Sequence, residues 1–210
     1  MTLISLKNEN SLADGVRKAE FSDGSSLFLS IYYLPGEINT VLEETPEKYA
    51  GWEFSPADEE AFFFAASCYK VEKAALRLIA RAEQNSLGLT AKLGRRFSDS
   101  AAVKAVVSRF LDRNLLDDGR YAERWIRSHL SGNRSPRWLL VSLAKRGIPR
   151  GVSLDALETV LDPETEYIQL LNYLEKTGFP KHKGRISLRA QLRFEGFSPA
   201  ALDRYFDALE

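Results

Sequence analysis

The feature that most constrains the fold of this chain is a motif that returns at a nearly constant interval. The stretches AKLGRRF, SLAKRGI and QLRFEGF each place basic or polar residues after a leucine and end on an apolar residue, a pattern typical of the C-terminal turn of a helix. Their leucines, Leu93, Leu143 and Leu192, are about 50 residues apart. Because a fixed period of this length is the signature of a repeat architecture, the chain is predicted to contain three tandem units.

Each unit is predicted to contain three helices, two before the repeated leucine and a short one after it. Ser-Pro and Asp-Pro steps, in which the first residue caps a helix and proline occupies its first turn, mark helix starts at Ser135, Asp162 and Ser198. Gly147 and Gly196 occupy positions where the end of a helix needs positive φ. The first repeat differs from the other two. Its apolar residue, Phe97, follows the leucine by four positions rather than five, and Arg96 stands before Phe97 where the others have glycine.

The N-terminal part of the chain has a different pattern. Residues 16–34 place β-branched and aromatic residues on both sides of Asp23-Gly24, a pair typical of tight turns, and this pattern predicts a β-hairpin. An isolated two-stranded hairpin is only marginally stable in water. The hairpin is therefore expected to pack on the following domain or to pair with another segment.

The predicted fold is mainly α, with three tandem three-helix repeats in an elongated curved array after an N-terminal β-hairpin region. Four domains are predicted. The hairpin region and linker cover residues 1–55, the first repeat 56–116, the second repeat 117–162 and the third repeat 163–210. Because Pro46, Gly51 and Pro56 interrupt the chain between hairpin and helices, a chain that starts near Ser55 is expected to stay folded and helical.

The composition, with 44% hydrophobic and 28% charged residues, predicts an ordinary cytoplasmic protein. The longest apolar run, AFFFAAS, is too short to cross a bilayer, and Met1 is not followed by the pattern of a secretory signal, so no membrane attachment is expected. The single cysteine, Cys68, cannot form an internal disulfide. His129 and His182 lack partners at ligand spacing, so neither a metal site nor a cofactor is predicted.

The formal net charge of zero hides an asymmetry along the chain. Residues 1–60 carry 4 Lys and Arg against 12 Asp and Glu, whereas residues 61–210 carry 25 against 17. Between Gly119 and Gly151 a single acid, Glu123, accompanies eight basic residues, namely Arg120, Arg124, Arg127, Arg134, Arg137, Lys145, Arg146 and Arg150. This local density predicts a polyanion or an acidic protein surface as the partner.

The stretch LLDDGRYAERWIRSH, from Leu115 to His129, is predicted to be an amphipathic helix. Its three arginines, Arg120, Arg124 and Arg127, are spaced i, i+4 and i+7 and form one stripe. Four residues form the opposite face, namely Tyr121, Trp125, Ile126 and Leu130. Asp117 and Asp118 are predicted to cap the helix rather than to form a catalytic pair. The stripe is either a solvated face or a binding surface, and the charge density favours binding.

Other candidate residues have mainly structural interpretations. Trp125 is predicted to lie in the core, and His129 to be packed or hydrogen-bonded rather than to act as a general base. Trp138 is predicted on the polar side of its helix, where it either stacks on a base or packs between repeats. The segment GFPKHKGR lacks the spacing of a phosphate-binding loop and is predicted to be a basic loop with three candidate phosphate contacts, Lys181, Lys183 and Arg185.

The segment LLDDGRYAERWIRSHLSGNRSPRWLLVSLAKRGI resembles the central repeat of the RecX family, the regulators of the RecA recombinase. The resemblance rests on Leu116-Asp117-Asp118, Tyr121-Ala122, Arg127, Ser135-Pro136-Arg137 and the helix end from Leu143 to Ile148. The stretch ALRLIARAEQNSLGLTAKL resembles the first repeat of the family. The layout of three units covers about residues 58–210.

The resemblance implies a non-catalytic regulator of homologous recombination and DNA repair, within the SOS response. Such a protein is expected to be a monomer that binds the groove of RecA filaments on single-stranded DNA and inhibits filament extension, ATP hydrolysis and strand exchange. The predicted contacts with RecA or DNA are Arg120, Arg124, Arg127, Arg134, Arg137, Lys145, Arg146, Lys181, Lys183 and Arg185. The alternative is a helical DNA-binding module that acts independently of RecA, because basic three-helix units also resemble helix-turn-helix folds.

Overall fold

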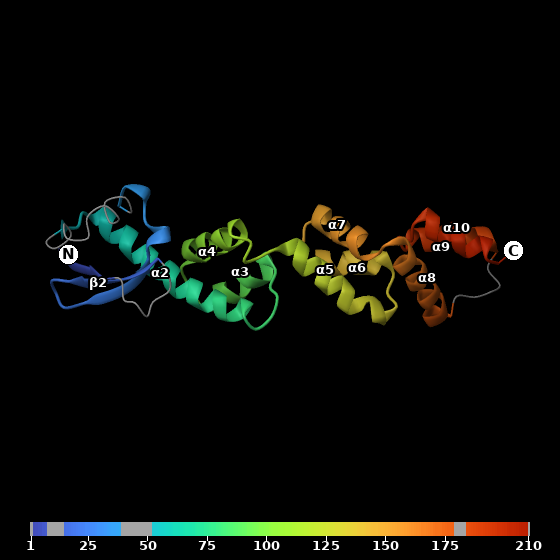
Figure 1. Cartoon of the computed structure of the whole chain (residues 1–210), viewed down its shortest axis with the longest axis horizontal. Helices are drawn as coiled ribbons and strands as arrows, with labels where there is room; N and C mark the ends of the chain where they lie inside the picture. Colours follow the sequence, from blue (N-terminus) through green and yellow to red (C-terminus); the bar gives the residue numbers. More distant parts are fainter. Residues whose placement is uncertain (1, 8–14, 39–51, 179–183, 210) are drawn as a thin grey trace. The chain divides into compact units, whose positions relative to one another are not determined.

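The computed structural model describes residues 2–7, 15–38, 52–178 and 184–209. These residues form two compact units. The first unit comprises the described residues of Met1–Glu83 together with Leu89–Leu116, and the second comprises Gln84–Gly88 together with the described residues of Asp117–Glu210. Most described residues are helical and a small antiparallel sheet lies near the N-terminus, as the sequence predicts (Figure 1). None of the helices within these ranges is long and apolar enough to span a membrane.

The sheet of the first unit has four strands in the order β3-β2-β1-β4. The predicted hairpin is confirmed, since β2 (Val16–Phe21) pairs antiparallel with β3 (Ser26–Ser30). On the other side of β2 lies β1 (Thr2–Lys7), which also pairs with the short strand β4 (Trp52–Glu53). The hairpin thus gains the additional pairing that an isolated hairpin lacks. Neither β1 nor β4 was expected from the sequence.

The helix α2 (Pro56–Ile79) packs on this sheet (Figure 1). It begins in a capping box, in which the Ser55 side chain accepts from the backbone N–H of Asp58 and the Asp58 carboxylate accepts from the backbone N–H of Ser55. Phe62 is fully buried in one cluster with Leu3 and Leu29 of the sheet. Burial of such a side chain stabilises the fold by about 1.5–3 kcal/mol, so the sheet and the start of α2 depend on a shared core.

The remainder of α2 forms a second core with α3 (Ser86–Gly94) and α4 (Ser100–Asp112). Leu93, the leucine of the repeated motif, is 1% exposed in this core. Asp99 caps α4 by accepting from the backbone N–H of Ala102 at 2.9 Å. These three helices are the first of the three-helix repeats.

The second unit contains the other two three-helix repeats. The second repeat consists of α5 (Asp118–His129), α6 (Pro136–Ala144) and α7 (Arg150–Val160), with the short turn η3 (Leu130–Gly132) after α5. The third consists of α8 (Pro163–Thr177), α9 (Arg185–Phe194) and α10 (Pro199–Asp207). Each repeat surrounds its own apolar core, in which Leu143 and Leu192 are fully buried.

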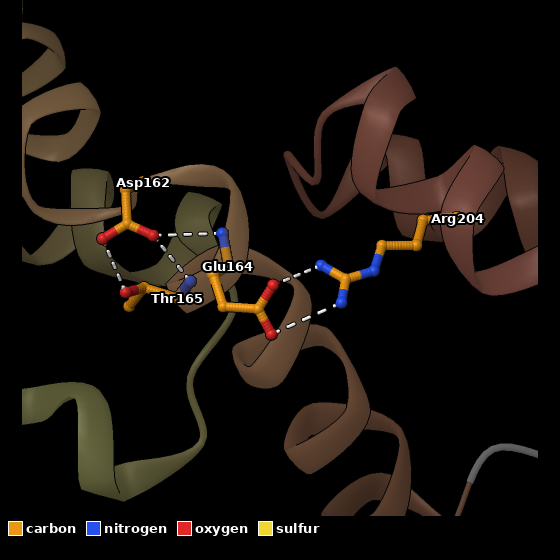
Figure 2. A network of polar contacts seen from close by, with 4 residues as sticks. All are labelled: Asp162, Glu164, Thr165 and Arg204. Atoms are coloured by element: carbon orange, nitrogen blue, oxygen red, sulfur yellow. Dashed lines mark hydrogen bonds and ion pairs between the residues drawn. The ribbon is translucent and has the colours of Figure 1, made fainter.

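The predicted helix caps are confirmed at all three proline steps. The side chains of Ser135, Asp162 and Ser198 each accept from a backbone N–H in the first helical turn, with proline at the first helical position. Figure 2 shows the cap of α8, in which the carboxylate of Asp162 accepts from the backbone N–H groups of Glu164 and Thr165 at 3.0 and 2.9 Å. The next acid along, Glu164, pairs with Arg204 of α10 at 2.6 Å and so joins two helices of the third repeat (Figure 2).

The predicted positive φ of the two repeated glycines is also confirmed, at 79° for Gly147 and 91° for Gly196. Within the second unit, Gly147 lies against the segment Gln84–Gly88. A Cβ atom at Gly147 would be 2.1 Å from a methyl group of Leu87, and the side-chain amide of Asn85 donates to the carbonyl oxygen of Arg146 at 2.6 Å. Glycine is required here for two reasons, its backbone conformation and the close approach of Leu87.

Gly196 makes the equivalent contact with the start of α6. A Cβ atom at Gly196 would be 3.2 Å from the backbone nitrogen of Arg137. That nitrogen donates to the carbonyl oxygen of Glu195 at 2.9 Å, and the Ser135 hydroxyl donates to the Glu195 carboxylate at 2.6 Å. The helices that carry the repeated leucines are α3, α6 and α9, and we call them the motif helices. The start of α3 therefore packs on the turn at Gly147 that ends α6, and the start of α6 packs on the turn at Gly196 that ends α9.

Candidate functional site

The predicted amphipathic helix is α5, and its two faces differ as expected. Ala122, Trp125 and Ile126 are buried in the core of the second repeat. The predicted stripe of three arginines, Arg120, Arg124 and Arg127, is exposed to solvent. The cationic side chains can therefore meet a partner without disturbing the core on which the helix packs.

Arg127 makes an ion pair within its own helix. Its guanidinium lies 3.1 Å from the carboxylate of Glu123, one turn earlier, and both side chains are accessible to solvent. An exposed pair of this kind contributes only about 0.2–1 kcal/mol. Arg127 can therefore leave Glu123 and bind a carboxylate or phosphate of a partner at a small cost in free energy.

A stack of aromatic rings lies on the side of α5 away from the arginine stripe. The imidazole ring of His129 is 3.9 Å from the indole of Trp125 between ring centroids, and Trp138 of α6 is 5.9 Å from Trp125 with its ring plane tilted by 21°. Trp125 is 9% exposed and Trp138 is 37% exposed. The predictions of a core position for Trp125 and a packed position for His129 are confirmed. Trp138 stacks on Trp125 within its own repeat, and the two alternatives for its exposed part, stacking on a base or packing between repeats, stay predictions.

Two of the predicted binding arginines cover this stack. The guanidinium carbon of Arg146 lies 4.5 Å from the ring centroid of Trp125, and that of Arg134 lies 4.7 Å from the ring centroid of Trp138. Arg146 also donates to the carbonyl oxygen of Ser142 at 2.8 Å. A guanidinium that stacks through its face keeps donors at its edge, so both arginines combine a packing role with capacity to bind anions.

Arg137 lies at the contact with the third repeat. Its guanidinium carbon is 3.8 Å from the ring centroid of Phe194 in α9, and its backbone nitrogen makes the hydrogen bond to Glu195 described above. The sequence placed Arg137 in a binding surface but did not indicate this contact. Lys145, the other predicted residue near the end of α6, is exposed.

The predicted contacts of the third repeat are separate from those on α5 and α6. Lys181 and Lys183 lie outside the described residues. Arg185 is the first residue of α9, and its guanidinium donates to the carbonyl oxygen of Phe206 at 3.3 Å and lies over the Phe206 ring. Arg185 therefore helps to hold the third repeat together, and its role in binding stays a prediction.

The two adjacent acids at the start of α5 both have structural partners, but only Asp117 caps this helix as predicted. Asp117 caps α5 by accepting from the backbone N–H groups of Gly119 and Arg120 at 2.8 and 2.9 Å. Asp118 accepts from the backbone N–H and the hydroxyl of Ser86 at 2.7 and 2.6 Å. Among the residues that the structure describes, no group of three or more His, Cys, Asp or Glu side chains is placed to hold a metal ion.

Known proteins resemble this chain in sequence and in fold. Residues 117–157 match the family model described as RecX, second three-helix domain. The regulatory protein RecX of Treponema pallidum (strain Nichols) is 32% identical over 155 residues, which cover 71% of this chain and 92% of that protein. The regulatory protein RecX of Halorhodospira halophila is 36% identical over 103 residues, which cover 49% of this chain and 62% of that protein.

Solved structures share the fold at lower sequence identity. A crystal structure of a regulatory protein RecX superposes with a TM-score of 0.65 and 15% identity, and the match covers 98% of each chain. The crystal structure of RecX from Lactobacillus salivarius has a TM-score of 0.53 and 20% identity over 68% of this chain and 96% of that one. The mainly helical fold with tandem three-helix repeats is therefore common to this chain and to these proteins.

Proposed function

Because this chain belongs to the RecX family of regulatory proteins, we propose that it regulates homologous recombination and DNA repair by binding RecA filaments on single-stranded DNA. In this proposal it limits filament extension, ATP hydrolysis and strand exchange without a catalytic site of its own. The observation that supports the proposal most directly is the exposed arginine stripe of α5.

The stripe has the properties that such a contact requires. Its helix is anchored by Trp125 and Ile126, so the arginines project from a surface that does not need to fold on binding. Guanidinium groups match carboxylates and phosphates with two parallel hydrogen bonds, each contributing about 1.5–3 kcal/mol. Either an acidic surface of RecA or the phosphates of the bound strand can provide the acceptors.

A binding comparison tests which of these partners the protein recognises. Affinity for bare single-stranded DNA is measured beside affinity for the same DNA coated with RecA, at matched salt. We expect binding to the coated strand to be stronger by at least about tenfold, a difference of about 1.4 kcal/mol in binding free energy. Equal or stronger binding to the bare strand would contradict the proposal and favour the DNA-binding module that acts without RecA.

The ATPase activity of RecA on single-stranded DNA gives a second readout. A protein of three tandem repeats offers binding surface to more than one filament subunit, since repeat proteins typically present extended surfaces. We therefore expect inhibition when the regulator is less abundant than RecA subunits. Undiminished ATP hydrolysis in an excess of regulator would rule out the inhibitory role.

A further inference from the structure

The third motif helix, α9, presents an apolar row to solvent. Ile186, Ala190 and Phe194 are spaced i, i+4 and i+8, so their side chains project from one side of the helix. All three residues are exposed, Ile186 at 88% and Phe194 at 65%. The buried residue of α9 is Leu192, on the opposite side. We call Ile186, Ala190 and Phe194 the α9 row, and it contributes little to the core of the third repeat.

The start of α9 differs from the starts of the other two motif helices. Leu87, Arg137 and Ile186 each precede the repeated leucine of their helix by six positions. Leu87 lies against the glycine turn at Gly147, and the backbone of Arg137 lies against the turn at Gly196. Ile186 occupies the equivalent position, yet it is the most exposed large apolar side chain among the described residues. A position that twice contacts a following repeat thus faces solvent in the third repeat.

The end of α9 also departs from the other motif helices. Arg95 and Lys145 follow the repeated leucine by two positions, and Phe194 occupies this place in the third repeat. A series of repeats normally ends in a polar outer face, because exposed apolar surface at its end promotes association. The third repeat instead exposes an aromatic ring and an isoleucine. The α9 row is therefore expected to be covered by a partner.

Charged side chains lie beside the α9 row. Arg189 and Arg193 are exposed and lie about one turn apart along one side of it. Arg189 forms an ion pair with Asp203 of α10, and the carboxylate of Glu195 accepts from the hydroxyl of Ser135. Both neighbouring acids therefore have partners within the chain. A patch of apolar residues with acids at its edge would complement this surface.

Arg137 connects the α9 row to the predicted binding surface. Its guanidinium carbon lies 3.8 Å from the ring centroid of Phe194, and Arg137 is one of the residues predicted to contact RecA or DNA. The exposed ring of Phe194 thus continues the surface to which Arg137 belongs. One partner can cover both.

The aliphatic part of the row distinguishes a protein from a nucleic acid as this partner. Phosphates can bind the arginines and a base can stack on Phe194, but Ile186 offers neither a hydrogen bond nor a ring. Burial of Ile186 against apolar side chains is favourable, in contrast. We propose that the α9 row binds an apolar patch of a RecA subunit with acidic residues at its edge. This inference rests on the proposed function for the identity of the partner, and it adds an apolar contact to the ionic contact of the α5 stripe.

The first experiment measures the affinity of the full chain for RecA-coated and for bare single-stranded DNA at matched salt. Ile186→Ser and Phe194→Ser should each weaken binding to the coated strand by about tenfold, as loss of a buried apolar contact does, and change binding to the bare strand by less than about twofold. Ile168→Ser is the matched control, because it removes the same side chain from an exposed position of α8. It should change either affinity by less than about twofold.

The second experiment repeats these measurements over a range of salt concentrations. Salt screens ionic contacts but does not screen the burial of apolar surface. Ile186→Ser should therefore lower affinity for the coated strand by the same factor at low and high salt. Arg124→Glu with Arg127→Glu should instead reduce the salt dependence of binding itself.

The outcomes separate this inference from the proposed function. Tight binding of the unaltered protein to RecA-coated DNA that persists in correctly folded Ile186→Ser and Phe194→Ser variants would overturn this inference alone. An equal loss of affinity for the bare strand would also overturn it, because the row would then be a DNA-binding surface. No binding of the unaltered protein to coated DNA would contradict the proposed function, and this inference with it.

Discussion

The imidazole ring of His129 stacks on the indole ring of Trp125, with 3.9 Å between centroids and 24° between the ring planes. The Nδ1 atom of the same histidine lies 2.8 Å from the carbonyl oxygen of Trp125. His129 therefore contacts both the ring and the backbone of the residue one turn earlier. The stack lies on the buried side of α5, whereas the arginine stripe faces solvent. Substitutions can therefore change the core and the predicted binding surface separately.

Replacing Arg124 and Arg127 together with Glu should abolish filament binding and leave the fold intact. Both side chains are exposed, so the change removes no apolar burial, and surface changes of this kind usually alter stability by about 0.5 kcal/mol or less. Binding should fall by at least about a hundredfold, because reversal adds repulsion to the loss of charge-assisted hydrogen bonds. Affinity for RecA-coated DNA is the measurement.

The matched control for this variant reverses two exposed arginines of the first unit, Arg77 and Arg81. Their replacement by Glu produces the same change in net charge and should leave filament affinity nearly unchanged. If the α5 variant bound filaments as tightly as the unaltered protein at physiological salt, the stripe would be only a solvated face. The contact would then have to be sought around Arg137, Lys145 and Arg146.

Trp125→Ala should destabilise the second repeat strongly. The substitution removes a buried indole on which His129, Trp138 and Arg146 stack, and large-to-small changes of this type typically cost about 3–5 kcal/mol. Urea denaturation followed by circular dichroism measures the loss. A cost below about 1 kcal/mol would mean that the stack does not support the core.

Gly147→Ala should be more destabilising than Gly178→Ala, although both glycines have positive φ. A left-handed conformation costs a residue with a side chain about 1–2 kcal/mol at either site. At Gly147 the new methyl group also collides with Leu87, whereas at Gly178 no atom of the described residues lies within 4 Å of a Cβ. Leu87→Ala should partly rescue Gly147→Ala in a double-mutant cycle, and simple additivity would exclude the proposed collision.

Asp162→Asn should remove part of the pH dependence of stability. Hydrogen bonds, chiefly from the backbone N–H of Thr165, lower the pKa of Asp162 below its usual value, so folding favours the ionised carboxylate. That contribution is fully present above the ordinary aspartate pKa and is lost as pH falls through the lowered value. The melting temperatures of the two proteins should differ most at neutral pH and converge in acid, and a constant difference would contradict this assignment.

A chain that starts at Ser55 should keep its cooperative helix melting but melt at a lower temperature. The deletion removes the sheet residues that cover Phe62, which is fully buried in the complete chain. The buried residues of the other three apolar clusters all lie in the retained part of the chain. Circular dichroism measures both effects, and loss of cooperative melting would show that the sheet is indispensable to the helical core.

The sequence predicted those features that depend on neighbouring residues. The caps at Ser135 and Ser198 and the turns at Gly147 and Gly196 arise from local backbone chemistry, and the interval of the leucines revealed the repeats. The amphipathic period of α5 separated its buried and exposed residues correctly. These signals need only a few consecutive positions, so sequence patterns record them.

Contacts between distant segments left no comparable signal. Strand β1 has no turn motif of its own and is defined by pairing with β2, and the bond of Ser86 to Asp118 joins residues 32 positions apart. The contact of Arg109 with the Tyr32 ring likewise joins the sheet region to the first repeat. Each of these arrangements depends on tertiary packing, which residue spacing alone does not specify.

The glycine turns at Gly147 and Gly196 favour the addition of further repeats at one end of the series over the other. Each of these turns contacts the start of the motif helix of the preceding repeat. The first repeat has Arg96 in place of this glycine, and its turn is closed by a hydrogen bond from the Phe97 N–H to the Leu93 carbonyl oxygen. A gene duplication that adds a copy of the third repeat at the C-terminal side supplies its own glycine. A copy added before the first repeat would have to pack its motif helix on the turn at Arg96, which has no glycine. We therefore expect RecX-like chains with extra repeats to have gained them toward the C-terminus.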